Sequence, residues 1–295
     1  MSTREQAVFD PVVAKQQLHQ EWQAAAPGWR GWLETMESPE GSNKLSRILV
    51  EQASLRPGDA VLDVGAGYGE PGLPAARAVA PGGRIMLQDL AGDMLAVARE
   101  RAAREGPDTV QFTYLEGDAE ALDLAPASLD AIVSRAAIMY FYDMAGTLQR
   151  LRSFLKPGGR LAASVWSTPE AVGFAAPMPV ILDALDLPPP SSGCMGPFAL
   201  NERERLAQVV RDGGFTDVES GTETAIWQFD SAEACTRFIR DVAPPITALV
   251  DQRPADIQER VWHRVTNEAW QPFLQSNGSV RLTNEAHWVA GTNPP

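Results

Sequence analysis

Three glycines and an acid stand close together near the start of the chain's most regular region. The segment VLDVGAGYGEP (61–71) places Asp63 two residues before the alternating glycines Gly65, Gly67 and Gly69. Glycines after a strand let the backbone approach a ligand and adopt positive φ, and a following helix presents free N–H groups. The segment predicts a small-molecule site, with a plain tight turn as the alternative.

The glycine spacing separates two classes of cofactor. A dinucleotide-binding loop has its third glycine three residues after the second, but Glu70 stands at that position. The carboxylate of Asp63 would repel a pyrophosphate and suits a ligand with a positive end, such as the ammonium of an amino acid. Both observations favour S-adenosylmethionine (SAM), which carries an ammonium, a sulfonium and no phosphate.

Two further acids follow later strand-like segments. Asp89 ends RIMLQDL (84–90), where a carboxylate can bind both hydroxyls of a ribose. Asp118 follows VQFTYLE (110–116), where a side-chain acceptor can meet the exocyclic amine of adenine. Taken alone, Asp118 would more often be a loop acid or a helix cap, so its support comes from its position in the series.

Strand-like and helix-like segments alternate along the middle of the chain. Apolar patterning predicts strands at 60–64, 84–90, 110–116, 129–135 and 160–166, and helices at 71–80, 92–105 and 143–155. This alternation is typical of βαβ units in a parallel sheet. With an extended stretch at 215–229 and a last strand at 279–291, we expect an α/β fold: a Rossmann-like, doubly wound, mostly parallel seven-stranded sheet.

The other segments predict helices that cover the sheet. We expect an N-terminal helical lid segment at 1–55 and a Rossmann-like SAM-binding domain at 56–295, with helical cap insertions at about 170–198 and 231–275. The helices expected after the fifth strand span 170–187, 201–214, 231–250 (broken at Pro244-Pro245) and 255–275.

Composition limits the partners. A formal net charge of −13 disfavours DNA or RNA, because binding to phosphates relies on clustered Lys and Arg. No apolar stretch reaches the ~20 residues that span a bilayer, and no signal-peptide pattern opens the chain. The two cysteines, Cys194 and Cys235, suit a reducing cytoplasm, and metal-ligand spacing is missing. We expect a cytoplasmic protein with a small-molecule partner and no metal, nucleic acid or membrane; a homodimer is compatible with the sequence.

Taken in order, these motifs resemble those of class I SAM-dependent methyltransferases. The likeness is carried by VLDVGAGYGEP, QDLAGDMLAVARERA, EGDAEAL, LDAIVSRAAIMYF and LRSFLKPGGRLAASVW. It is strong over about 45–166 and weaker toward the C-terminus. The nearest branch includes ubiquinone/menaquinone-biosynthesis and many natural-product methyltransferases. The resemblance implies a Rossmann-like fold, SAM as the cofactor and S-adenosylhomocysteine (SAH) as the product.

The resemblance also implies which residues hold the cofactor. Asp63 would place the methionine end and Asp89 the ribose. The other implied residues are Gly65, Ala66 and Gly67 in the backbone cradle, Leu90 and Met94 against adenine, Asp118 and Ala119 at the adenine edge, and Ser134 and Arg135 at the methionine side. An ion pair with an acid at the sheet's edge is an equal alternative for Arg135. Gln88 departs from the family, which often has valine or isoleucine and a small residue before the second-strand acid.

Candidate residues for the acceptor are chosen by position and apolar character. They are Trp22, Trp29, Met139, Tyr140, Phe141, Phe174, Met178, Phe238 and Trp262. Core packing is the alternative for the N-terminal tryptophans and for Met139. If the acceptor needs a base, His19 and His263 are the best placed, with Tyr140 as a further catalytic candidate.

The sequence predicts a SAM-dependent methyltransferase for a small, hydrophobic, natural-product-like acceptor, with O-methylation ahead of C- or N-methylation. One alternative is a SAM-binding enzyme that does not methylate, such as a cyclase. Another is an NAD(P)-dependent reductase, against which Asp63 and the glycine spacing argue. A Mg²⁺ ion shared by substrate and carboxylates would leave little trace in a sequence.

Overall fold

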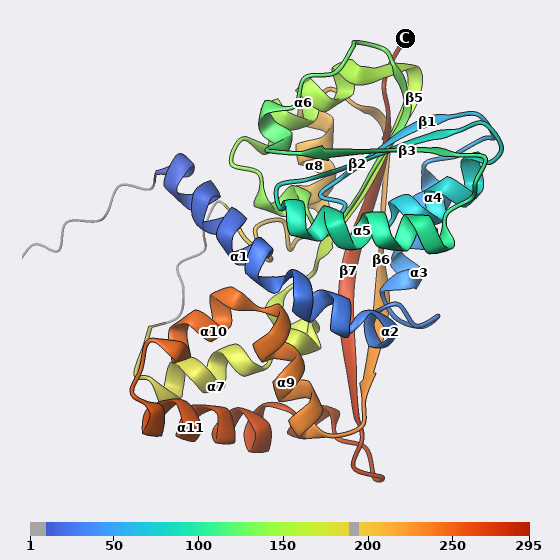
Figure 1. The fold of residues 1–295 in the computed structure, drawn as a ribbon. Helices are drawn as coiled ribbons and strands as arrows, with labels where there is room; N and C mark the ends of the chain where they lie inside the picture. Colours follow the sequence, from blue (N-terminus) through green and yellow to red (C-terminus); the bar gives the residue numbers. More distant parts are fainter. Residues whose placement is uncertain (1–9, 189–194) are drawn as a thin grey trace, which may run out of the picture.

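One seven-stranded sheet forms the centre of the molecule. The computed structural model describes residues 10–188 and 195–295. Its strand order is β3-β2-β1-β4-β5-β7-β6, with β7 antiparallel to both neighbours and the other pairs parallel (Figure 1). The strands are β1 Ala60–Val64, β2 Arg84–Asp89, β3 Gln111–Glu116, β4 Leu129–Arg135, β5 Leu155–Trp166, β6 Thr216–Phe229 and β7 Val280–Thr292. The predicted Rossmann-like sheet is confirmed.

Helices cover both faces of the sheet, as its continuous apolar strands require. On one face lie α3 (Ser42–Gln52), α4 (Gly72–Val79) and α5 (Gly92–Glu105), whose apolar residues pack with Val61 and its neighbours. On the other face lie α6 (Met144–Phe154) and α8 (Arg203–Asp212), which pack with Leu62 and its neighbours. Successive side chains of β1 therefore point into two separate apolar cores, because side chains alternate between the two faces of a strand.

A ribbon formed by β6 and β7 extends past the rest of the sheet. Trp166, the last residue of β5, pairs with Ala286, and residues 280–285 of β7 continue the pairing with β6 beyond that point. The ribbon thus runs past the edge at which the parallel strands end, here called the carboxyl edge. The helices between β6 and β7 therefore lie on the same side of the molecule as that edge (Figure 1).

Four helices pack together at the end of this ribbon and are here called the cap. They are α7 (Pro177–Ala184), α9 (Ala232–Val242), α10 (Pro244–Asp251) and α11 (Ala255–Arg264). They share one apolar core with the ribbon, centred on Phe238 and Trp270. The predicted break at Pro244 is confirmed, and α11 continues into a π-helical turn at Val265–Ala269. Residues 189–194 of the insertion expected at 170–198, Cys194 among them, lie outside the described residues.

The single helix expected at 170–187 is wrong in its first part. Val172 forms a β-bridge with Asn284, and the N–H of Phe174 donates to Asn284 Oδ1 at 3.1 Å. These bonds hold the chain in short 3-10 turns at Pro169–Ala171 and Gly173–Ala175, so a regular helix begins only at Pro177.

The N-terminal helix α1 (Pro11–Gly31) lies between the sheet and the cap (Figure 1). Asp10 caps it by accepting the N–H of Val12 at 2.9 Å. Its other end meets α9, where the indole N–H of Trp32 donates to Asp241 at 2.9 Å. The short helix α2 (Leu33–Met36) leads on to α3. Residues 1–9 of the expected lid segment lie outside the described residues.

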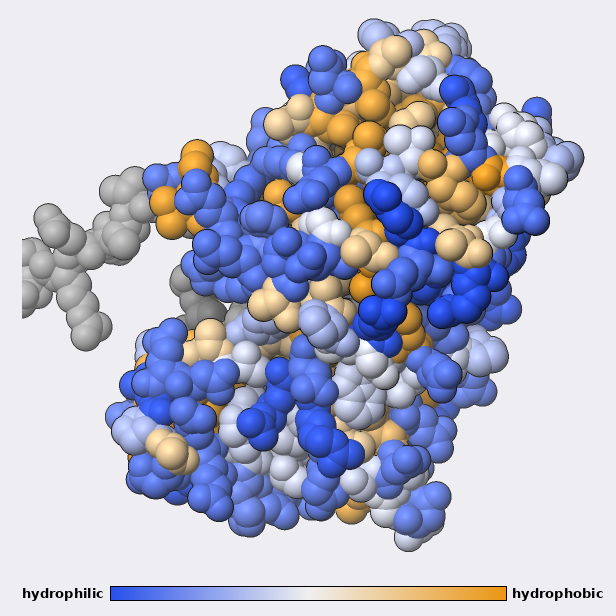
Figure 2. Space-filling model, in the orientation of Figure 1, coloured by the Kyte–Doolittle hydropathy of each residue, from blue (hydrophilic) through white to orange (hydrophobic). Residues whose placement is uncertain are grey.

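Surface hydropathy follows this layout. Figure 2 shows hydrophilic residues over most of the cap and an apolar tip at the start of α1, where Val12 and Val13 are exposed. Within residues 10–188 and 195–295, we find no helix that combines the length and the apolar character needed to cross a membrane.

The contact between α1 and α9 generates a prediction about stability. A Cβ atom on Gly28 would lie 2.0 Å from the carbonyl oxygen of Asp241, whereas one on Gly31 would meet nothing within 4 Å. We expect Gly28→Ala to lower the free energy of unfolding by about 1–3 kcal/mol through overpacking. Gly31→Ala, on the same helix, should change it by less than about 1 kcal/mol. Urea unfolding measures both, and equal effects would contradict this account of the contact.

Candidate active site

The glycine loop (65–71) follows β1 at the carboxyl edge. Gly65, Gly67 and Gly69 all have positive φ, at 66°, 52° and 100°. A Cβ on Gly65 would lie 2.3 Å from that of Ala137, so this glycine allows the loop to pack on the segment after β4. A Cβ on Gly67 would meet nothing within 4 Å, which leaves that part of the loop open to a ligand.

Asp63 carries a buried oxygen atom that lacks a partner. The residue is fully buried, and its Oδ2 accepts the N–H of Gly72 at 2.7 Å. Its Oδ1 is buried and has no hydrogen-bond partner. Burial raises the pKa of Asp63 well above its usual range, although the Gly72 N–H and Arg135 act in the opposite direction. A buried acceptor without a donor fits the ammonium group of SAM, so these residues suit that cofactor.

Two consecutive residues at the end of β2 hold the neighbouring loops. Asp89 accepts the N–H groups of Gly67 at 2.8 Å and Ala91 at 2.9 Å, and burial raises its pKa. The side chain of Gln88 accepts the N–H of Gly65 at 3.3 Å and donates to the carbonyl of Gly117 at 2.5 Å. Gln88, the residue at which the sequence departs from the family pattern, is therefore a buried link between two loops.

Asp118 follows β3 and has two partners. Its Oδ1 accepts the N–H of Glu120 at 3.0 Å, so it does cap the short 3-10 turn Ala119–Ala121. Its Oδ2 contacts the ammonium of Lys15, which reaches across from α1 and also contacts Glu120. Sequence reasoning did not single out Lys15, although it lies four residues before His19 on the same face of α1.

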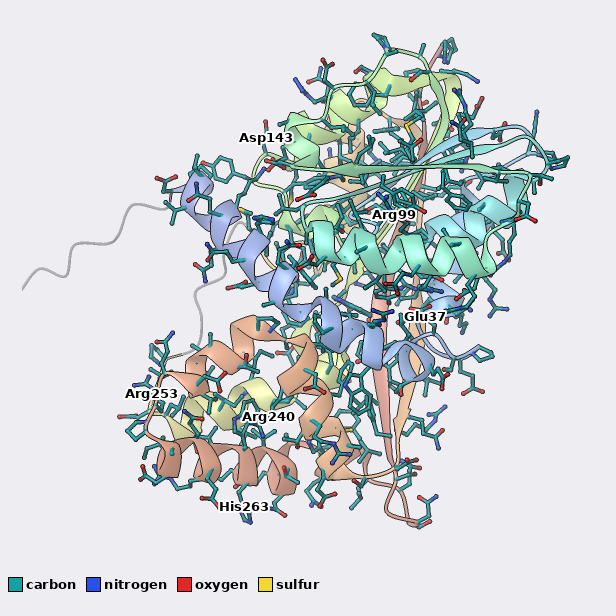
Figure 3. The ribbon with its side chains drawn as sticks, in the orientation of Figure 1. Glu37, Arg99, Asp143, Arg240, Arg253 and His263 are labelled. Atoms are coloured by element: carbon teal, nitrogen blue, oxygen red, sulfur yellow. The ribbon has the colours of Figure 1, made fainter. Side chains whose placement is uncertain are left out.

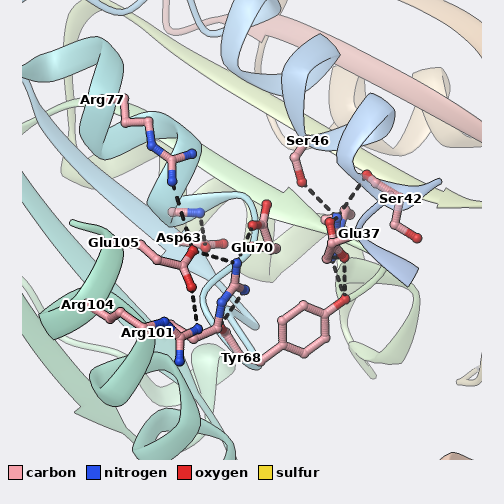
Figure 4. Close-up of polar contacts among 12 residues, drawn as sticks. Glu37, Ser42, Ser46, Asp63, Tyr68, Glu70, Arg77, Arg101, Arg104 and Glu105 are labelled. Atoms are coloured by element: carbon pink, nitrogen blue, oxygen red, sulfur yellow. Dashed lines mark hydrogen bonds and ion pairs between the residues drawn. The ribbon is translucent and has the colours of Figure 1, made fainter. Parts of the chain in front are cut away.

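The end of β4 is tied to the N-terminal segment. The hydroxyl of Ser134 donates to the carbonyl of Val64 at 2.8 Å, which joins β4 to β1. The guanidinium of Arg135 binds both carboxylate oxygens of Glu37, at 2.7 and 3.1 Å, and donates to the hydroxyl of Tyr68 at 2.6 Å (Figure 4). Arg135 thus pairs with an acid, the alternative that the sequence left open. Glu37 and Tyr68 were not predicted.

The remaining cofactor candidates lie around these loops. Ala66 is buried, and its N–H donates to the carbonyl of Gln88 at 2.8 Å. Leu90 is half-buried after Asp89. Met94 packs in a small apolar cluster under α1, and Ala119 is buried at the start of its turn.

One face of α1 is turned toward the carboxyl edge. Its residues stand three or four positions apart: Lys15, His19, Trp22, Ala26 and Trp29. The ring of Trp22 lies 5.9 Å from that of Tyr140, and Trp29 stacks on Tyr68 of the glycine loop at 5.7 Å. Lys15 reaches Asp118, as described above. Since every one of these contacts falls on a loop at the carboxyl edge, α1 covers the site.

Two of the three catalytic candidates lie at this edge. The Nε2 atom of His19 is buried and lacks a hydrogen-bond partner. Burial, with a smaller effect of Glu21, raises the pKa of Tyr140 well above its ordinary value, so its hydroxyl stays neutral.

His263 lies elsewhere. It is on the outer side of α11, beside an open groove of about 650 Å³ in the cap, and its nearest polar partner is Asn267 (Figure 3). The structure does not bring it together with the residues of the glycine loop.

The acceptor candidates divide into two groups. Trp22, Trp29 and Tyr140 form the aromatic contacts beneath α1. Phe174 stacks on Trp227 at 5.5 Å, and Met178 is half-buried on α7. The others, Met139, Phe141, Phe238 and Trp262, are buried in the apolar cores, where packing is their evident role. Among the side chains that the structure describes, no group of three His, Cys, Asp or Glu residues is placed to hold a metal ion.

Comparison with known proteins agrees with this geometry. Residues 55–177 match the family described as a methyltransferase domain. Over 114 residues the chain is 39% identical to the ubiquinone/menaquinone biosynthesis C-methyltransferase UbiE of Bradyrhizobium diazoefficiens. The match covers 39% of this chain and 45% of that protein. The matched domain and this relative support a class I SAM-dependent methyltransferase. They favour SAM over the nicotinamide alternative.

Solved structures share the fold. The phosphoethanolamine N-methyltransferase 2 of Haemonchus contortus, solved with SAH, is 18% identical, with a TM-score of 0.57, and the match covers 98% of this chain and 61% of that one. The [4+2]-cyclase SpnF is 17% identical, with a TM-score of 0.57 and coverage of 95% and 97%. At such low identity, both likenesses concern the fold alone.

The open side of Gly67 generates a prediction about cofactor binding. We expect Gly67→Ala to weaken SAH binding by at least about tenfold, because the new methyl group would occupy the space left for the ligand. Gly58→Ala is the matched control, since Gly58 also has positive φ (91°) and open space but lies before β1, at the other edge. Both variants should lose about 1–2 kcal/mol of stability to backbone strain. Calorimetric titration with SAH that found equal affinities in the two variants would contradict the proposed cradle.

The raised pKa of Asp63 generates a pH prediction. A cationic ligand end favours the carboxylate, so binding should expel a proton, and SAH affinity should rise with pH through the pKa of Asp63 while the ligand's amino group stays charged. The free energy of unfolding of the unliganded protein should fall as the pH rises through the pKa of folded Asp63. A carboxyl group whose pKa is raised by folding stabilises the protein only while it stays protonated. Titration in buffers of different ionisation enthalpy measures the proton. Asp63→Asn should remove the pH dependence and weaken binding about tenfold; a flat pH profile for the unmodified protein would refute the assignment.

Proposed function

We propose that the protein transfers the methyl group of SAM to a small hydrophobic acceptor, with oxygen as the preferred methylated atom. The observation that carries this proposal is the aromatic face of α1, which lies across the carboxyl edge where the cofactor candidates converge. An acceptor held between that face and the edge would meet rings and apolar side chains. Such a surface suits an apolar, ring-containing molecule better than a charged one.

The cofactor would be held by the loops after β1, β2 and β3. Asp63 would accept the ammonium through Oδ1, the backbone around Gly67 would line the methionine portion, and Asp89 would bind the ribose. Asp118 remains the candidate for adenine, although Lys15 shares its carboxylate. When bound, SAM supplies a methyl group already activated by the sulfonium.

The chain's own residues would then align the acceptor and exclude water. Trp22, Trp29 and Tyr140 would form the walls under α1, and Phe174 and Met178 would contribute from the cap side. Alignment and a dry pocket account for most of the rate gain in reactions of this kind. The tyrosine hydroxyl of Tyr140, neutral at physiological pH, would orient the acceptor by a hydrogen bond.

His19 is the residue we propose as the proton acceptor. Its buried Nε2 lacks a partner and lies on the covering face of α1, between Lys15 and Trp22. An acceptor hydroxyl bonded there would lose its proton to the imidazole as the new bond to carbon forms. Carbon is the alternative methylated atom, because the curated relative is a C-methyltransferase.

The test is a methyl-transfer assay with radiolabelled SAM and a panel of phenols, hydroquinones, naphthols and polyketide-like alcohols. We expect labelled product and an equal amount of SAH, and NMR of the product identifies the methylated atom. His19→Gln should lower kcat by about 10²–10⁴-fold, whereas His263→Gln should leave it unchanged. Turnover of an acceptor without SAH would instead identify a non-methylating enzyme, and no transfer across the whole panel would count against the proposal.

A further inference from the structure

Gln88 is a buried amide at the junction of two loops that, under the proposed function, would hold opposite ends of SAM. The residue is 2% exposed and stands at the second-to-last position of β2. Its Oε1 accepts the N–H of Gly65 at 3.3 Å, and its Nε2 donates to the carbonyl of Gly117 at 2.5 Å. Gly65 belongs to the glycine loop, and Gly117 directly precedes Asp118. One side chain therefore spans from the methionine side of the site to the adenine side.

The chemistry of these two bonds requires an amide. One partner is a donor and the other an acceptor, so the linking group must accept at one atom and donate at the other. A valine or isoleucine could do neither, and an ionised carboxylate could only accept. Without Gln88, the partly buried N–H of Gly65 and carbonyl of Gly117 would both need new partners.

The backbone around Gln88 strengthens the same junction. The carbonyl of Gln88 accepts the N–H of Ala66 at 2.8 Å, and that of Asp89 accepts the N–H of Gly117 at 2.9 Å. The side chain of Asp89 holds Gly67. The end of β2 thus fixes both loops by main-chain bonds as well, and the Gln88 side chain is the direct link between them.

We propose that Gln88 is a positioning residue that sets the separation between the glycine loop and the Gly117–Asp118 loop. It contacts neither acceptor nor reacting atoms; it acts through the two loops, and it matters most for a ligand that occupies both at once. This inference rests on SAM being the cofactor. It goes beyond the proposed function because it concerns a residue at which the chain departs from the family pattern.

The alternative is a purely structural amide, and the chain offers a matched example. Asn293 is also buried, and its amide donates to the carbonyls of Leu155 and Lys156 while accepting from Arg152. Those partners lie at the start of β5 and near the end of α6, away from the carboxyl edge. Removing the Asn293 amide should therefore cost stability without altering the cofactor site.

The experiment compares Gln88→Met with Asn293→Leu, two apolar replacements of similar shape. Calorimetric titration uses SAH, which spans both loops, and 5′-methylthioadenosine, which lacks the amino-acid end. For Gln88→Met we expect SAH to bind about tenfold more weakly, with less than about a twofold change for methylthioadenosine. In a methyl-transfer assay the KM for SAM should rise while kcat changes little. Asn293→Leu should leave both affinities unchanged.

A second variant covers the case in which methionine prevents folding. Gln88→Glu keeps the shape and the bond from Gly65, and at a pH high enough to ionise the buried carboxyl it removes the donor to Gly117, so there it should show the same contrast between the two ligands. Unchanged SAH affinity, or equal weakening of both ligands, would overturn the positioning role. If the unmodified protein did not bind SAH at all, the cofactor assignment itself would fail, which is a different result.

Discussion

The buried ion pair between Arg135 and Glu37 joins the three parts from which the site is built. Arg135 ends β4, Glu37 follows α2, and the hydroxyl of Tyr68 in the glycine loop bonds to both (Figure 4). Withdrawing two charges from water is costly, and the cost is offset only when the geometry is good and the remaining donors are satisfied. Here the carbonyl of Ser42 and the hydroxyl of Ser46 accept further hydrogen bonds from the guanidinium of Arg135. The pair fixes the turn after α2 against β4 and the glycine loop, which ties the N-terminal helices to the carboxyl edge.

Several charged side chains lie close together behind the glycine loop. Asp63 and Glu70 are buried and Glu37 is nearly so, and their carboxyl groups face the guanidinium groups of Arg101 and Arg135 (Figure 4). Glu105 also pairs with Arg101. Burial raises the pKa of Glu70 as well as that of Asp63, and neighbouring carboxylates act in the same direction. A ligand with a positive end beside Asp63 would favour the ionised form of that carboxyl.

Features set by local pattern could be predicted from the sequence, and features set by distant contacts could not. Strand and helix order, the glycine loop and the acids after β1 to β3 all follow from spacing within a few residues. The partners of Arg135 and Asp118 lie 98 and 103 residues away, the first directly after α2 and the second on α1, where the sequence shows only that one face is apolar. The helix expected from residue 170 failed for the same reason, because its backbone bonds to Asn284. Gln88 was noticed only as an exception, since nothing local indicates that its amide faces two loops.

The ribbon of β6 and β7 separates the chain into parts under different structural constraint. The pairing register of strands β1 to β5 fixes the positions of the loops that would hold the cofactor. An insertion in one of these strands would therefore shift several of those loops at once. The segment 230–279 connects the two strands of the ribbon at its far end. Residues there can be gained, lost or exchanged without disturbing the pairing of strands in the parallel sheet. Under the proposed function, a change confined to this segment would alter the acceptor side of the site and leave the cofactor loops in register.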